Sequence, residues 1–119
     1  MFEGLTVHEA VEEARKLYLP YPNRVPREFK QTGLTPGEYK EAYEAWEKAR
    51  TEYEKAMASY EKRYSEVNDA LEDLIKTEAG FEKVPEASRG KVWALAWENG
   101  HSSGYLEVYY QLIDLVALF

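Results

Sequence analysis

The sequence predicts an all-α protein, an elongated and coiled-coil-like helical bundle with one long central helix, a short N-terminal helix and two C-terminal helices. Three observations predict this fold: a heptad pattern in the middle of the chain, two capping boxes, and a C-terminal segment that is apolar on nearly every side. The heptad positions are Tyr39, Trp46, Tyr53, Tyr60, Val67 and Leu74, and alanines follow four of them at Ala42, Ala49, Ala56 and Ala70. Such a narrow apolar stripe requires other helices to cover it.

The first helix is expected over residues 6–19. Thr6 and Glu9 form a capping box, and Pro20 disfavours helical geometry in the residue before it. Residues 20–35 form a proline-rich linker that also carries more basic than acidic side chains. Its apolar residues are placed to pin it against the bundle, and they are Tyr21, Val25, Phe29 and Leu34.

The long helix is expected over residues 36–79. Thr35 and Glu38 form the second capping box, with Pro36 at the first helical position, and Gly80 supplies the stop. The weak helix formers Ser65, Asn68 and Asp69 leave open a bend. The heptad stripe keeps its phase across them, so one continuous helix is predicted.

Two further helices are expected over residues 85–99 and 103–119. The first ends at the stop pair Asn99-Gly100, and Ser102 or Ser103 is predicted to cap the second. From Tyr105 onward only Glu107, Gln111 and Asp114 are neither apolar nor tyrosine, so burial on several sides is expected. The bundle closes either within one chain or in a homodimer or larger homo-oligomer, and the sequence leaves this open.

Composition limits the classes of function. The chain has 119 residues, enough for one domain, and no cysteine, which excludes thiolate metal ligands and thiol nucleophiles and fits a reducing cytoplasm. It has neither a secretory signal pattern nor an apolar run long enough to span a membrane. The net charge of −7 disfavours direct nucleic-acid binding. It suits a protein partner with a basic surface, such as one that itself binds nucleic acid.

No catalytic, cofactor or metal motif is recognisable, so we predict a protein that is not an enzyme and that needs no cofactor or metal. His101 and Ser102 are sequence neighbours, which rarely gives the geometry of a nucleophile and its base. The only other histidine, His8, is far away in sequence, so a histidine-based metal site is disfavoured.

Two sets of residues are the candidate sites. For protein binding they are the acidic side chains Glu44, Glu47, Glu52 and Glu54, whose carboxylates can imitate phosphate spacing, together with Tyr105, Tyr109 and Tyr110, which cannot all face one core. For a small anionic ligand they are Trp97, His101, Ser102, Ser103 and Tyr105, at the turn that opens the last helix. The simpler interpretations are a solvated helix face for the glutamates and an ordinary polar turn for the second set.

The C-terminal third also resembles a known group of proteins. The matching residues are Val84-Pro85-Glu86, Lys91-Val92-Trp93, Trp97-Glu98, Gly100-His101-Ser102-Ser103-Gly104-Tyr105, Glu107-Val108-Tyr109 and Asp114-Leu115-Val116. This segment resembles the C-terminal segment of small uncharacterised proteins encoded by tailed bacteriophages. The resemblance implies a small protein made in the cytoplasm of an infected bacterium, and it carries over no catalytic or binding residues.

The leading hypothesis is therefore a non-enzymatic protein-binding module, a phage-encoded inhibitor or modulator of a bacterial host or defence protein, used in host takeover. One alternative is a binder of a small anionic ligand or nucleotide at the Gly100–Tyr105 turn. The other is a structural coiled-coil element of a phage particle. The sequence does not identify the target protein.

Overall fold

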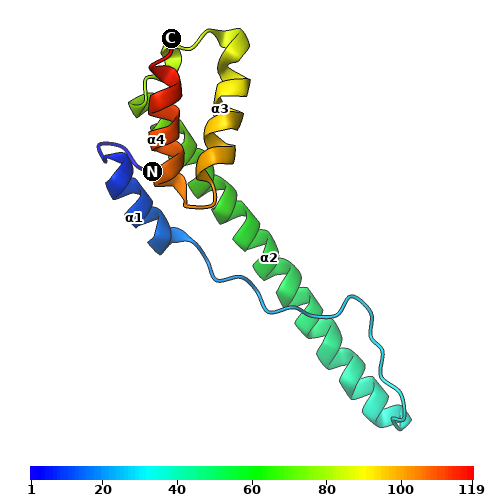
Figure 1. Ribbon diagram of the computed structural model, residues 1–119. Coiled ribbons are helices and arrows are strands. Elements are labelled where there is room, and N and C mark those ends of the chain that lie inside the picture. Colours follow the sequence, from blue (N-terminus) through cyan, green and yellow to red (C-terminus); the bar gives the residue numbers. More distant parts are fainter. The chain divides into compact units, whose positions relative to one another are not determined.

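The structure is a computed structural model that describes residues 1–119. Its elements are α1 (Val7–Leu17), α2 (Pro36–Glu78), the short 3₁₀-helix η1 (Phe81–Lys83), α3 (Glu86–Gly100) and α4 (Tyr105–Val116) (Figure 1). The predicted all-α fold is confirmed. The chain forms two compact units: a core unit of residues 1–18 and 65–119, and a strap unit of residues 19–64. Helix α2 contributes to both.

Both capping boxes form as predicted. At the start of α1 the Thr6 N–H donates to Glu9 Oε1 at 3.1 Å, and the Glu9 N–H donates to Thr6 Oγ1 at 3.2 Å. Hydrogen bonding of the Glu9 carboxylate to the Thr6 backbone, and then to the Thr6 side chain, lowers the pKa of Glu9. At the start of α2, the Glu38 N–H donates to Thr35 Oγ1 and the Thr35 N–H donates to Glu38 Oε1, each at 3.3 Å. Helix α1 ends at Leu17, two residues earlier than predicted, because Tyr18 already has extended backbone with ψ 132°.

Helix α2 is a single helix of 43 residues that continues through residues 65–69. It ends next to Gly80, whose φ of +73° is the left-handed conformation that favours glycine. The following η1 was not predicted. The Arg89 side chain holds this turn, donating from Nε to the Val84 carbonyl at 2.9 Å and from Nη2 to the Glu82 carbonyl at 3.0 Å.

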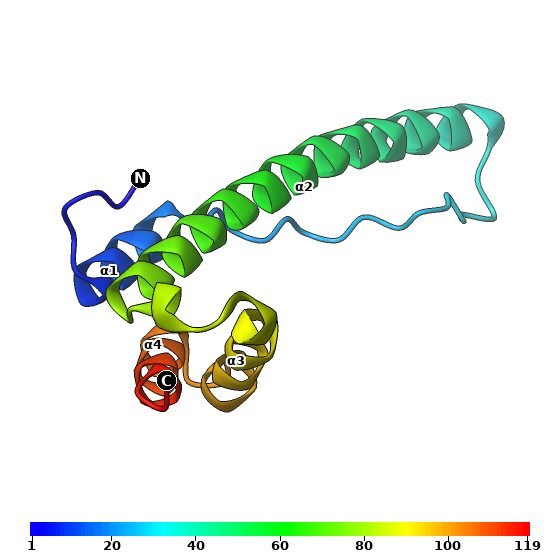
Figure 2. The ribbon, with the colours of Figure 1, turned by 90° about the horizontal axis from the view of Figure 1, so that it is seen from above.

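The core unit buries one apolar face from each of its helices. Helix α4 contacts both α1 and α3 and lies between them, and α3 and α4 run antiparallel (Figures 1 and 2). The Tyr18 hydroxyl donates to Asn68 Oδ1, and the Val7 N–H donates to Glu78 Oε2 at 3.3 Å, so α1 is also tied to α2. The buried side chains are Phe2, Val7, Ala10, Val11, Ala14, Val67, Leu71, Ile75, Val84, Val92, Ala96, Val108, Leu112 and Val116.

Gly100 is the last residue of α3, but it does not have the left-handed conformation of the predicted helix stop. It has no positive φ and is buried against the backbone of α4. A Cβ atom at this position would lie 2.5 Å from the Val108 nitrogen and 2.7 Å from the Glu107 carbonyl carbon. Gly100 is therefore a point of close backbone contact between α3 and α4, rather than a left-handed helix stop.

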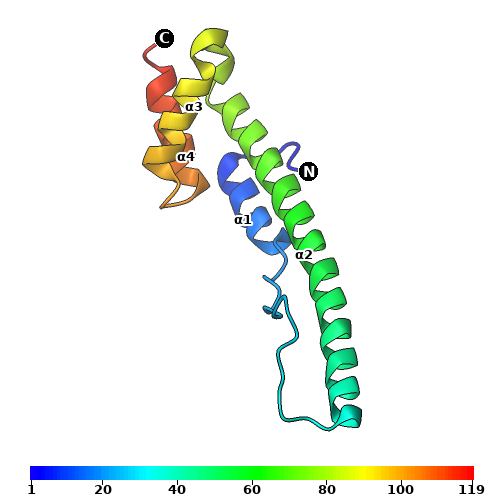
Figure 3. The same ribbon diagram turned by 90° about the vertical axis from the view of Figure 1, so that its right-hand side faces the viewer.

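In the strap unit, the extended linker rather than a helix lies against the first four heptad residues, whereas the sequence predicted that helices would cover the whole stripe. No residue of α2 before Val67 is buried. Residues 19–35 run alongside the N-terminal part of α2 as an extended strap (Figure 3). The Phe29 ring lies 5.3 Å from the Tyr39 ring and 5.5 Å from the Tyr43 ring. The predicted pinning of the linker by its apolar residues is thus confirmed for Phe29.

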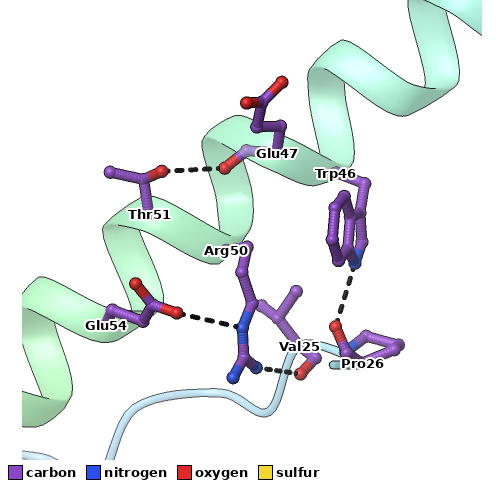
Figure 4. A network of polar contacts seen from close by, with 7 residues as sticks. All are labelled: Val25, Pro26, Trp46, Glu47, Arg50, Thr51 and Glu54. Atoms are coloured by element: carbon purple, nitrogen blue, oxygen red, sulfur yellow. Dashed lines mark hydrogen bonds and ion pairs between the residues drawn. The ribbon is translucent and has the colours of Figure 1, made fainter. Parts of the chain in front are cut away.

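Hydrogen bonds fix the middle of the strap to α2 (Figure 4). The Trp46 indole N–H donates to the Pro26 carbonyl, and Arg50 Nη1 donates to the Val25 carbonyl, each at 2.9 Å. Both carbonyls belong to an extended segment that forms no backbone hydrogen bonds with a neighbouring strand. Side chains of α2 therefore donate the hydrogen bonds that these carbonyls would accept from the backbone in a helix.

Replacing Phe29 with alanine is expected to loosen the strap and to leave the core unit folded. The ring supplies the main apolar contact of the strap with Tyr39, Tyr43 and Trp46, whereas the core unit contains no strap residue. Trypsin should then cleave the full-length chain after Arg24 and Arg27 several-fold faster than it cleaves wild type.

The exposed Gln31→Ala variant serves as the control in the same strap. Equal cleavage rates for Phe29→Ala and Gln31→Ala would show that the ring does not hold the strap.

Candidate functional site

The turn between α3 and α4 brings together three of the five residues predicted to bind a small ligand. The Trp97 ring stacks on His101 with centroids 5.8 Å apart, and it lies 5.5 Å from the Tyr105 ring. His101 Nδ1 lies 3.0 Å from the Trp97 carbonyl oxygen. Because a carbonyl oxygen only accepts, Nδ1 is the donor in this contact.

The predicted serine caps are wrong. The N-cap of α4 is Gly104, with φ +103°, and no side chain caps the helix. The Gly104 carbonyl accepts from the Glu107 N–H at 3.1 Å, and the Ser103 N–H donates back to Gly100 at the same distance. The backbone thus closes the turn by itself and leaves both Ser102 and Ser103 exposed.

A cavity of about 160 Å³ lies beside the start of α4 and is lined by Ser103 and Tyr105 together with Val11, Ala14 and Leu71. Small-molecule sites usually span roughly 300–1,000 Å³. Trp97, His101 and Ser102 do not line it. The turn therefore gathers an aromatic and imidazole cluster on the surface, but it does not combine the five predicted residues into one pocket.

The three tyrosines of α4 have different environments, and one of them faces solvent. Tyr105 and Tyr109 are partly buried against the core, whereas Tyr110 is 43% exposed. Burial, followed by the nearby charge of Glu78, raises the pKa of Tyr109. The Tyr110 hydroxyl lies 2.9 Å from His8 Nε2 on α1. Of the tyrosines predicted to bind a protein, Tyr110 is therefore the one most available to a partner.

Tyr110 belongs to an apolar stripe on the outer side of α4. Leu106, Tyr110, Ile113 and Ala117 follow each other at spacings of four, three and four residues, so they share one helix face. Leu106 is half-buried, because it packs against the core and also lines the cavity beside the start of α4, and the other three are exposed. The buried positions Val108, Leu112 and Val116 define a separate, inward face. We call these four residues the α4 stripe.

The predicted acidic docking residues do not form a continuous carboxylate row. Glu44, Glu47 and Glu52 line a shallow depression on α2, but Lys48 and Lys55 line the same depression. Glu54 instead lies with its Oε1 3.4 Å from Arg50 Nε. Alternating charges of this kind compensate one another, which favours a solvated helix face.

The excess negative charge lies mostly in the core unit. That unit carries fourteen acidic and six basic side chains, a formal net charge of −8, whereas the strap unit carries eight acidic and nine basic side chains, a formal net charge of +1. Glu107 and Asp114 are exposed on α4, where they lie beside the α4 stripe along the helix surface. The apolar stripe and the acidic surface thus occur in the same unit.

Sequence reasoning identified Tyr110 but missed Leu106, Ile113 and Ala117. Their spacing is present in the sequence, yet a segment that is apolar on nearly every side gives no indication of which face is buried. None of the helices combines the length and the apolar character that crossing a membrane requires.

The chain matches a known protein family. The model of a protein family whose function is unknown matches residues 25–119, which is most of the chain and includes α2, α3 and α4. No curated protein matches, and no solved structure matches.

Proposed function

This chain belongs to DUF8546, a family of unknown function, and we propose from its own geometry that it is a non-enzymatic protein-binding module. The docking surface is the α4 stripe. The single observation that carries this proposal is that α4 leaves Tyr110, Ile113 and Ala117 exposed on a second face after its first face has been buried in the core.

An uncovered face of this kind is what a partner helix or groove recognises. Side chains at spacings of four, three and four residues are the anchors that helix-in-groove interfaces use. Tyr110 and Ile113 are 43% and 36% exposed, so their burial in a complex would remove apolar surface from water. Tyrosine is also enriched among the residues that contribute most to binding energy.

The negative charge around the α4 stripe indicates the charge of the partner's binding surface. With a net charge of −8, the core unit attracts a partner whose binding surface is basic around an apolar centre. A surface that binds nucleic acid has this character. Steering of this kind predicts that association slows as salt concentration rises.

The biological setting of the proposal rests on the resemblance of residues 84–116 to a segment of tailed-phage proteins. On that basis the partner is a bacterial host or defence protein, and the chain acts in the bacterial cytoplasm as its inhibitor or modulator.

The test is affinity capture from nuclease-treated bacterial lysate with the tagged full-length chain, quantified by mass spectrometry. We expect Ile113→Glu to reduce capture of the dominant partner about tenfold or more, because it places a charge in the centre of the docking face. Leu95→Glu on α3 is the matched control, since Leu95 is 38% exposed and lies outside the stripe.

The proposal requires Ile113→Glu to capture less partner than Leu95→Glu does. Equal capture by Ile113→Glu and wild type would overturn it, as would loss of capture only when Glu44, Glu47 and Glu52 are reversed to lysine. Far-UV circular dichroism of each variant establishes that the helices remain folded.

A further inference from the structure

A second candidate site lies in the strap unit, on a side of α2 that differs from the depression lined by Glu44. Between the strap and α2 is a groove of about 680 Å³, within the size range of small-molecule sites. Three arginines line it, Arg24 and Arg27 from the strap and Arg50 from α2, together with Tyr21 and Tyr53. Glu61 is the one carboxylate among its lining residues. We call it the arginine groove.

The strap places its groove residues by a simple repeat. Tyr21, Arg24 and Arg27 are spaced three residues apart, and prolines precede or follow them at positions 20, 22 and 26. Extended chains rich in proline favour a helix with three residues per turn, which directs every third side chain to one side. All three side chains line the same groove, as that periodicity requires.

The guanidinium groups in the groove differ in how they are held. Arg50 is fixed, because it donates to the Val25 carbonyl at 2.9 Å, pairs with Glu54, and lies 5.2 Å from the centre of the Tyr53 ring. Arg24 and Arg27 are exposed and form no ion pair or hydrogen bond within the chain. Two unpaired arginines facing one groove are suited to a phosphate group, which guanidinium binds with paired hydrogen bonds.

An aromatic surface accompanies these cations. The Tyr21 ring contacts the Tyr60 ring edge-on, with centroids 5.1 Å apart, and Tyr21 is nevertheless 63% exposed. This contact holds the ring while leaving much of it open to solvent. An aromatic ring of a ligand can stack on such a surface while its phosphate lies against the arginines.

We propose that the arginine groove binds a phosphorylated aromatic small molecule, a mononucleotide, through Arg24, Arg27 and Tyr21. A nucleic-acid strand is a poorer fit, because it needs a basic track that continues beyond one nucleotide. Here Glu54 and Glu61 bound the cationic surface, and the whole strap unit has a formal net charge of only +1. The site is independent of the α4 stripe.

The test is a fluorescence-anisotropy titration of the full-length chain with N-methylanthraniloyl-ADP, followed by competition with ADP, adenosine and inorganic phosphate. We expect saturable binding that ADP reverses and that adenosine or phosphate alone reverses only at much higher concentration. Arg24→Ala combined with Arg27→Ala should weaken binding about tenfold or more, and Tyr21→Ala about threefold or more.

The matched control is Lys48→Ala combined with Lys55→Ala, which removes the same charge from the same unit at the other depression. It should leave the affinity unchanged within about twofold, since these lysines do not line the arginine groove. Absence of saturable binding at millimolar probe would overturn the proposal, as would equal losses in both double variants. A single-stranded oligoribonucleotide that binds far more tightly than ADP through the same arginines would replace it with a nucleic-acid site.

Discussion

The Gly100→Ala variant is expected to lose about 2–3 kcal/mol of unfolding free energy, a large effect for the addition of one methyl group. The added Cβ would lie 2.5 Å from the Val108 nitrogen and 2.7 Å from both the Val108 Cα and the Glu107 carbonyl carbon. All three are backbone atoms, so no side-chain rotation relieves the clash. Helices α3 and α4 must move apart, which opens the contact between their buried faces.

Gly90→Ala on the same helix is the control. A Cβ at position 90 has no heavy atom within 4 Å, so this change should be neutral or stabilising, by up to about 1 kcal/mol from helix propensity. Urea unfolding followed by circular dichroism measures both variants. If Gly100→Ala proved as stable as Gly90→Ala, the close approach of α3 and α4 at Gly100 would be refuted.

The Leu112→Ala variant is expected to be destabilised by about 2–5 kcal/mol, which is the range for a large-to-small change at a fully buried site. Leu112 is 0% exposed and lies on the inward face of α4. Because α4 contacts both α1 and α3, a cavity here weakens the packing of several helices at once. Small domains have only about 5–15 kcal/mol of stability in total, so the variant should be partly unfolded at elevated temperature.

Leu95→Ala provides the comparison, because Leu95 is 38% exposed and its truncation leaves little cavity. Its loss should be below about 1 kcal/mol. Thermal melts of the two leucine variants side by side separate the core contribution from the general effect of removing a leucine. Similar melting temperatures would mean that the α4 face assigned to the core does not hold the unit together.

Local signals in the sequence specify the starts of α1 and α2 and the end of α2 well, because each depends on neighbouring residues only. The capping boxes at Thr6 and Thr35 set the starts of α1 and α2, and Gly80 sets the end of α2 to within one residue of the prediction. These are interactions within a single turn, so the sequence alone indicates where they form.

Features that depend on distant partners were not predictable in the same way. The heptad pattern shows that a stripe needs cover, but it does not show whether a helix or an extended strap provides it. A glycine after a helical segment is typical of a helix stop, so the sequence does not distinguish Gly100 from one. Its close contact with Val108 depends on which face of α4 packs against α3. The serine caps failed because Gly104 adopts a left-handed φ and takes the N-cap position itself.

The candidate site was predictable only in part from the sequence. The sequence indicated that Tyr105, Tyr109 and Tyr110 cannot share one core, and only the packing of α4 shows that Tyr110 faces outward. The candidate glutamates Glu44, Glu47, Glu52 and Glu54 suggested an acidic docking surface on the long helix predicted over residues 36–79. The boundary between the units falls inside that range, so much of the acidic charge of this helix belongs to the core unit.

The most direct test of the proposed function is a hydrogen-exchange footprint of the full-length chain, free and bound to the partner that it captures. Burial of the α4 stripe predicts slower amide exchange in peptides covering residues 105–117, with no change in peptides covering residues 44–54. Protection confined to residues 44–54, with α4 unaffected, would contradict the assignment of the α4 stripe as the docking surface.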